Sequence, residues 1–165
     1  RKEQFEEACD LSHGNSVVDV TAFPVDEGEH AWSAPDAWER FHARGCPAEN
    51  LTISTDGGGC LPHFDENGEM VKMEFATSAG LPDTIRELTA RGHTLDAVLP
   101  SMTSNVARLL RLPGKGKLAE GNDADLVCFD AGFGVRHVMA RGRWMIQDGS
   151  PVVSGVFESC RHAEH

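Results

Sequence analysis

The sequence predicts an α/β fold over residues 1–112, a segment of β-strands over residues 113–157 and a tail over residues 158–165. Two observations indicate the α/β part: helical and β patterns alternate in the first third of the chain, and helical patterns continue after the second β run. A third observation, the loss of helical periodicity after Pro113, indicates the β segment. Because parallel strands need helical crossovers, the alternation predicts parallel pairing.

The first elements are predicted to be a helix, a strand, a helix and a strand. Apolar residues on one face predict a helix over residues 2–13, and a β-rich run over residues 17–20 follows it. Ser33 has the character of an N-cap, and Gly45 ends the helix that Ser33 begins. The run over residues 51–54 is the second predicted strand.

The pattern changes directly after this second strand. Residues 55–70 are rich in Gly, Pro, Asp and Asn, which predicts a long loop. Long ordered loops in compact domains are usually functional or flexible. A helix over residues 78–91 and another from Thr94 to Leu110 are predicted to follow, and Pro100 is expected to kink or divide the second one.

Short strands and turn pairs fill the β segment. Arg141-Gly142 and Asp148-Gly149 are typical of turns between strands. The four predicted strands cover residues 126–129, 135–140, 144–146 and 152–153. The segment is typical of part of a second, small β domain. A complete α/β barrel needs about 250 residues, so this chain, with two clear βα units, is too short to be one.

Charge and cysteine usage limit the possible functions. A net charge of −11 argues against nucleic acid or an anionic membrane as a partner. No apolar run approaches the roughly 20 residues of a membrane helix. The five cysteines form no C-x-x-C pair, so we expect reduced thiols in a cytoplasmic protein. No signal-peptide pattern and no initiator Met are present, so we expect the chain to begin partway through a longer protein.

The run from Ser54 to Pro62 is the strongest candidate for chemistry. Asp56 follows a predicted strand, and in α/β barrels the C-terminal strand ends face the active site. A carboxylate there can bind a metal and take a proton from metal-activated water. The three glycines after Asp56 allow the backbone to approach a ligand closely. Asp-Gly is also a common turn pair, and a turn without chemistry is the more frequent explanation of the motif taken alone.

A second motif, from Pro113 to Val127, has a structural logic. Its glycines form turns, Asn122 and Asp123 satisfy loop backbone groups, and Asp125 leads into a strand that is predicted to be buried. The glycine and lysine content is reminiscent of a phosphate loop. The G-K-[ST] ending is missing and a strand follows rather than a helix, which excludes that interpretation.

These segments carry a family resemblance. Thr103–Leu110, then Gly116–Leu118, then Gly121–Val127 resembles the C-terminal signature of the amidohydrolase superfamily, and Val138–Arg143 with Asp148-Gly149 continues it. In that superfamily, this segment returns from the last helix of the barrel to a β-sandwich built from both chain ends.

Within the superfamily, the chain resembles the β-aspartyl (isoaspartyl) dipeptidases. The similar segments are Ser54–Pro62 followed by Phe64–Glu69, and Phe5–Ala8 leading to Val18–Thr21. The resemblance implies the C-terminal part of a metal-dependent-hydrolase (β/α)8 barrel, followed by strands of a small β-sandwich domain. It also implies hydrolysis of β-aspartyl dipeptides.

The resemblance assigns roles to three residues. Asp56 matches the last-strand aspartate, which is catalytic: it binds one of two divalent cations, usually zinc, acts as general base and later protonates the leaving amine. Cys60 falls where the dipeptidases have a small residue that touches the α-carboxylate of the substrate. Arg1 matches the end of a His-x-Asn-Arg motif whose Arg contacts substrate.

The other metal ligands of the family are a His-x-His pair, a carboxylated Lys and two further histidines. None of the eight histidines here has that spacing, so we do not expect this chain alone to assemble a two-metal site. The expected partners are a small dipeptide substrate and further copies of the protein in a homo-oligomer. Three alternatives remain: another amidohydrolase acting on cyclic amides or N-acyl amino acids, a non-catalytic fragment or oligomerisation module, and a small-molecule-binding domain that uses the glycine loop.

Overall fold

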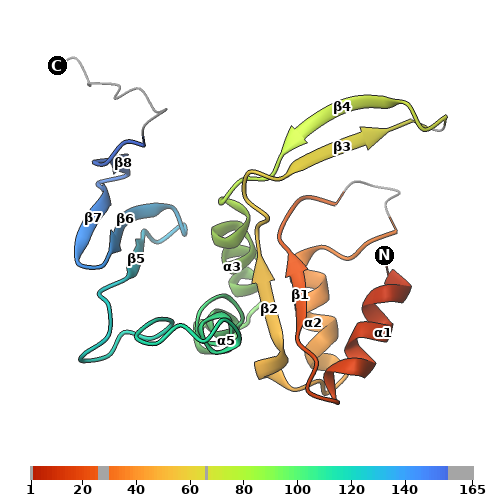
Figure 1. The fold of residues 1–165 in the computed structure, drawn as a ribbon, viewed down its shortest axis with the longest axis horizontal. Coiled ribbons are helices and arrows are strands. Elements are labelled where there is room, and N and C mark those ends of the chain that lie inside the picture. Colours follow the sequence, from red (N-terminus) through yellow and green to blue (C-terminus); the bar gives the residue numbers. More distant parts are fainter. Residues whose placement is uncertain (1, 26–29, 66, 156–165) are drawn as a thin grey trace.

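The computed structural model describes residues 2–25, 30–65 and 67–155 (Figure 1). Arg1 and the predicted tail at 158–165 therefore lie outside the described residues. The N-terminal elements are α1 (Lys2–Ser12), β1 (Val18–Thr21), α2 (Ala34–Ala43), the short 3-10 helix η1 (Ala48–Asn50) and β2 (Leu51–Ser54). The predicted order of helix, strand, helix and strand is confirmed.

The two strands form a parallel pair, as the alternation predicts. Val18 lies opposite Leu51, and Thr21 lies opposite Ser54. Helix α2 crosses between the strands and contacts both of them as well as α3. Ser33 caps α2, since its Oγ accepts the backbone N–H of Asp36 at 3.3 Å.

The core lies between the helices and one face of this strand pair. The helices contribute Trp38, Phe41 and Leu88, which are almost fully buried, and β2 contributes Leu51 and Ile53. Apolar residues alternate with polar ones along both strands, so one face packs on the helices while the other carries hydroxyl and carboxylate groups.

Four helical pieces follow the strands in place of the two predicted helices. Helix α3 covers Gly80–Ala90, and the second predicted helix is divided into α4 (Leu95–Val98), the 3-10 helix η2 (Leu99–Met102) and α5 (Ser104–Leu109). The division at Pro100 was expected, because proline has no backbone N–H for the helical ladder.

A β-hairpin occupies much of the segment that was predicted as a loop. Strands β3 (Cys60–Phe64) and β4 (Met70–Phe75) pair antiparallel: β3 runs away from the C-terminal end of β2, and β4 runs back towards it (Figure 1). The loop prediction is therefore wrong for residues 60–64 and 70. The turn explains the difference: Asp65 Oδ1 accepts the backbone N–H groups of Asn67 and Glu69, so polar residues that indicate a loop here close a hairpin.

The β segment forms one antiparallel sheet in the order β5-β6-β7-β8. The strands are β5 (Leu126–Phe129), β6 (Val135–Ala140), β7 (Arg143–Gln147) and β8 (Ser150–Pro151). The last strand begins earlier than predicted, because the tight Asp148-Gly149 turn returns the chain at once, with both residues at positive φ. Val127 and Cys128 are exposed, so the prediction of a buried strand after Asp125 is wrong.

Candidate active site

Asp56 lies just beyond the C-terminal end of β2. The three residues Leu51, Thr52 and Ile53 are buried, which fixes the strand in the core up to the point where Asp56 leaves it. Asp56 itself is exposed and has φ 50°, in the left-handed region. Among the described residues its carboxylate enters no ion pair, so the group is available to a ligand.

The glycines after Asp56 form a hydrogen-bonded turn. The Gly59 N–H donates to the Asp56 carbonyl at 2.8 Å. A Cβ on Gly59 would lie 2.8 Å from that carbonyl oxygen and 3.1 Å from Asp56 Oδ2, so only glycine fits. Gly58 and Gly59 also exchange backbone hydrogen bonds with Ala76, each at 2.9 Å. The turn thus fixes the loop that carries Asp56 and ties it to the base of the hairpin.

A polar network on the two strands precedes Asp56 and was not predicted. Asp19 on β1 accepts hydrogen bonds from Thr52 Oγ1 and Ser54 Oγ on β2, both at 2.6 Å. The sequence signal is the alternation of polar and apolar residues in both strands, which places Asp19, Thr52 and Ser54 on the face away from the helices. The network links β1 to β2 on the face away from the helices. It lies near the C-terminal end of β2, two residues before Asp56.

Of the other two predicted site residues, the structure describes Cys60 but not Arg1. Cys60 opens β3, four positions after Asp56, as an exposed free thiol. Arg1 lies outside the described residues, so its substrate contact stays a prediction. His63, which follows on β3, is half-buried, and its Nε2 lies 2.9 Å from Glu74 Oε2.

The chemistry of the donors fits one part of a metal centre. In residues 2–25, 30–65 and 67–155, no group of three or more His, Cys, Asp or Glu side chains could hold a metal ion. Asp56 offers a free carboxylate, which suits a divalent cation as a single ligand. A metal centre that includes Asp56 would need further donors from outside the described residues.

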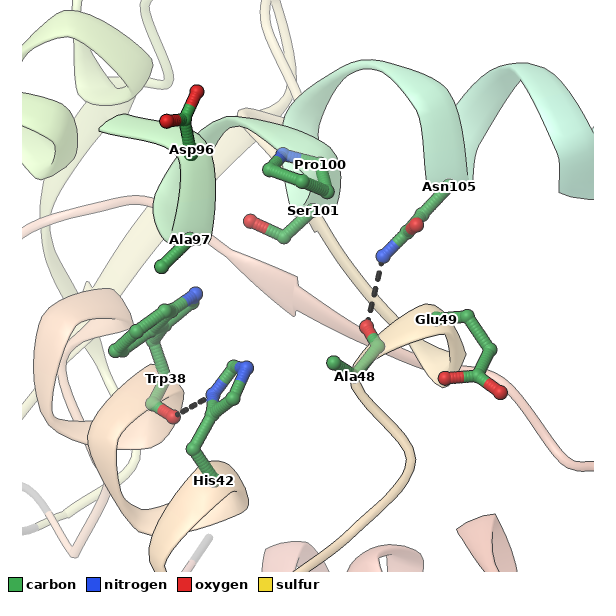
Figure 2. Close-up of a pocket in the computed structure, with 9 residues that line it drawn as sticks. All are labelled: Trp38, His42, Ala48, Glu49, Asp96, Ala97, Pro100, Ser101 and Asn105. Carbon is green, nitrogen blue, oxygen red and sulfur yellow. Dashed lines mark hydrogen bonds between the residues drawn. The ribbon is translucent and has the colours of Figure 1, made fainter. Parts of the chain in front are cut away.

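The cavity shown in Figure 2 lies at the opposite end of β2, beside η1. It has a volume of about 270 Å³, and α2, η1, α4, η2 and α5 contribute to its wall. The indole Nε1–H of Trp38 has no hydrogen-bond partner among the described residues. Because η1 precedes the strand, this cavity is at the N-terminal strand end, where barrel proteins keep structural rather than catalytic residues.

The second motif, Pro113–Val127, has a structural role, as predicted. Lys115 forms ion pairs with Asp123, at 2.8 Å, and with Asp125. Asp125 also accepts the backbone N–H of Arg141 at 2.7 Å. The hydrogen bond from Lys115 holds the pKa of the Asp125 carboxyl below its usual range. These contacts join the loop before β5 to the turn between β6 and β7, and they engage the carboxylates of both Asp123 and Asp125.

Asn105, in the motif that resembles the superfamily signature, is also structural. Its Nδ2 donates to the carbonyls of Ala48 and Leu51, both at 2.9 Å. The amide therefore ties α5 to the start of the strand that leads to Asp56.

No helix in the described part of the chain is long and apolar enough to cross a membrane.

Comparison with known proteins gives a family and close structural relatives. The amidohydrolase family model matches residues 28–145. A crystal structure of β-aspartyl dipeptidase from Fervidobacterium islandicum AW-1, in complex with the β-Asp-Leu dipeptide, is 33% identical with a TM-score of 0.82. The match covers 96% of this chain and 40% of that one. The incomplete α/β barrel followed by β-strands, predicted as the fold class, is confirmed.

Two further relatives are more distant. Adenine deaminase 2 from Agrobacterium fabrum is 27% identical over 128 residues, which are 76% of this chain and 19% of the deaminase. The N-acetylglucosamine-6-phosphate deacetylase of Thermotoga maritima is 18% identical with a TM-score of 0.56, over 79% of this chain and 39% of that one, and it shares the fold alone. The chain thus spans well under half the length of each relative.

Proposed function

This chain belongs to the amidohydrolase family, and we propose that the protein containing it hydrolyses β-aspartyl (isoaspartyl) dipeptides with Asp56 as a catalytic residue. The observation that carries the proposal is the free, exposed carboxylate of Asp56 directly after the buried strand β2. The similarity of the chain to the structure of a β-aspartyl dipeptidase in complex with β-Asp-Leu also supports the proposal.

Asp56 has two tasks in the proposed reaction. Its carboxylate takes a proton from the attacking water and then delivers that proton to the leaving amine, as a general base that becomes a general acid. Asp56 is also proposed as one ligand of a pair of divalent cations, with zinc as the proposed metal. When bound, such cations polarise the scissile carbonyl and lower the pKa of water.

The substrate contacts are proposed on either side of Asp56. Cys60 stands at the first position of β3, and a thiol is only a weak hydrogen-bond donor. We therefore assign the contact with the α-carboxylate of the dipeptide to a backbone N–H at this position rather than to the thiol. The Arg1 guanidinium is proposed as a second contact, because it can bind a carboxylate with two parallel hydrogen bonds.

The substrate is tested by the products that the full-length protein releases. We expect it to release leucine from β-Asp-Leu and to leave α-Asp-Leu intact, because β-linkage places the α-carboxylate where Cys60 and Arg1 are proposed to bind. Chelation of divalent cations should abolish the reaction, and zinc should restore it. Equal rates on the two dipeptides, or full activity after chelation, would contradict the proposal.

A second candidate is deamination of adenine, which the similarity to Adenine deaminase 2 favours. Asp56 could transfer protons in that hydrolysis as well. The two candidates differ in their products: ammonia is released from adenine, and a free amino acid from β-Asp-Leu. Ammonia release without cleavage of any β-aspartyl dipeptide would favour the deaminase.

We also propose a cellular location, a class of partner and an assembly for the protein. We infer a cytoplasmic location, since Cys9, Cys46, Cys60 and Cys128 are free thiols, the state that a reducing compartment maintains. The acidic charge argues against nucleic acid or an anionic membrane as the partner, and a small dipeptide substrate is proposed from the family resemblance. A homo-oligomer is proposed as the working assembly.

A further inference from the structure

Two buried cysteines contact each other across 37 positions of the sequence. Cys9 lies on α1 and is fully buried, and Cys46 follows the end of α2 and is 6% exposed. The Cys46 thiol donates to the Cys9 carbonyl oxygen at 3.6 Å, and the two thiols also form a hydrogen bond with each other. Because the described residues alone bury this pair, its contact does not depend on the rest of the polypeptide.

The end of helix α2 fixes the position of Cys46. Gly45 has φ 68°, in the left-handed region, and its N–H donates to the His42 carbonyl at 2.9 Å. The Cys46 N–H donates to the Phe41 carbonyl at 3.3 Å. These two bonds form the Schellman motif that commonly ends a helix. The motif turns the chain so that Cys46 packs into the core directly after the helix.

Ion pairs hold α1, which carries Cys9, against the end of α2. Glu6 and Asp10 on α1 both pair with Arg44, the C-cap residue of α2, the first of them at 2.6 Å. Exposed ion pairs contribute little stability individually, but two that share one guanidinium restrict how the helices are placed. Cys9 lies between Glu6 and Asp10 in the sequence, so these contacts keep its thiol beside Cys46.

His13 connects the buried pair with solvent. Its Nε2 lies 3.8 Å from the Cys46 Sγ, while the residue as a whole is exposed. The imidazole can therefore take the thiol proton of Cys46 and exchange it with water. Burial, followed by the charge and the hydrogen bond of Cys46, raises the pKa of the Cys9 thiol to about 11, so Cys9 keeps its proton. Since the thiolate is the nucleophile, Cys46 suits the attack on an oxidant and Cys9 suits the closing step.

We propose that Cys9 and Cys46 are a modification site, at which hydrogen peroxide converts the two thiols into a reversible disulfide. Cys46 gives its proton to His13, and its thiolate attacks one peroxide oxygen. The S–O bond forms, the O–O bond breaks, and the leaving hydroxide takes the proton from His13. The Cys9 sulfur then attacks the Cys46 sulfur, so the S–S bond forms and the S–O bond breaks. The hydroxide leaves as water with the Cys9 proton, and the balance is two thiols and one peroxide to one disulfide and two waters.

The disulfide joins α1 covalently to the end of α2. It closes a loop that separates two cysteines 37 positions apart, which restricts the unfolded chain. In a reducing compartment such a bond is transient: a peroxide forms it, and small thiols remove it by exchange once the cysteines become accessible. The free thiols of the structure are the reduced state of this site.

The test is disulfide mapping of the full-length protein after brief exposure of the native state to hydrogen peroxide. This oxidant is small enough to reach a thiol that is 6% exposed. The remaining thiols are blocked during unfolding, and the chain is cleaved after glutamate, which separates Cys46 from Cys60 at Glu49. We expect a linked pair of peptides that contain Cys9 and Cys46, lighter by two hydrogen atoms than the free peptides, and separated by dithiothreitol.

Substitutions assign the roles within the site. Cys9→Ala should abolish the linked pair, whereas Cys128→Ser, the matched control at an exposed thiol on β5, should leave its yield unchanged. His13→Gln removes the proton acceptor from an exposed position and should slow the linking at least about tenfold. An unchanged rate in His13→Gln would overturn the role of His13.

The mapping of the wild-type protein decides the proposal without any substitution. Recovery of Cys9 and Cys46 as free thiols, while Cys60 and Cys128 are oxidised, overturns it. A bond from Cys9 or Cys46 to a different cysteine, or a bond between them that forms only after unfolding, also overturns it.

Discussion

Asp56 and its neighbours show how a turn and a candidate catalytic residue can share one motif. The Asp-Gly-Gly-Gly run forms a hydrogen-bonded turn, as is usual for Asp-Gly sequences. Gly59 is required in this turn because a Cβ there would clash with the Asp56 carbonyl oxygen. The same turn leaves the Asp56 side chain exposed at the end of a buried strand. Local sequence could not separate the two explanations, because both require the same residues.

The cysteines give a prediction at this scale. Cys9 and Cys46 are buried, and burial, with the nearby Cys46 thiol, raises the pKa of the Cys9 thiol to about 11. We expect Cys60 and Cys128 of the native protein to react with iodoacetamide at pH 8, and Cys9 and Cys46 to react only after unfolding, because the thiolate is the nucleophile. Mass spectrometry of the labelled peptides measures this.

The same shift fixes the direction of a pH effect. The pKa of Cys9 is higher in the folded chain than its ordinary value of 9.0, so the folded state holds the proton more tightly. The resulting stabilisation is complete below about pH 9 and is lost as the pH rises towards 11. Rapid labelling of Cys9 in the folded protein at pH 8 would show that the thiol is not buried as described.

At the scale of elements, the loop before β5 is held by contacts that glycine permits. Gly116 has φ 77°, and a Cβ there would lie 2.7 Å from Ala107 Cβ and 2.9 Å from the Thr103 carbonyl. The loop therefore packs closely on α5. Asn105 then fastens α5 to the start of β2, so a motif of the family signature positions the strand that leads to Asp56.

Substitution of two glycines separates packing from backbone strain. Gly116 and Gly121 both have positive φ, but nothing lies within 4 Å of a Cβ at Gly121. Gly121→Ala should cost about 1 kcal/mol from the backbone alone. Gly116→Ala should cost roughly 1–3 kcal/mol more, because the added methyl group meets α5. Urea unfolding of both variants measures the difference, and equal losses of stability would show that the loop does not pack on α5.

What the sequence could predict differs between elements for physical reasons. The alternation of β1, α2 and β2 was predictable because core residues recur at the period of each element, and Ser33 marks a cap by its own chemistry. The hairpin was missed because Pro62 and the polar turn at Asp65 are typical of loops, while its pairing depends on contacts across the turn. The Asp19 network depends on the register of two strands that lie 33 residues apart.

At the scale of the whole molecule, the described residues provide part of a barrel. They include one parallel strand pair, β1 and β2, and the exposed carboxylate of Asp56 just beyond the C-terminal end of β2. No metal-binding group of three side chains is present among them. A two-metal site therefore needs donors from outside the described residues, and we expect the isolated 165-residue chain to be inactive. Zinc-dependent hydrolysis of β-Asp-Leu by that chain alone would disprove this expectation.

The most direct test of the central claim is the turnover of β-Asp-Leu by the full-length protein with Asp56→Asn. Asparagine tolerates the left-handed backbone at φ 50°, so the fold should persist while the proton-accepting carboxylate is lost. The matched control is Asp148→Asn, at φ 51° in the exposed turn before β8. The account predicts a fall in kcat of at least about 10²-fold for Asp56→Asn and none for Asp148→Asn. Equal activity of the two variants would contradict it.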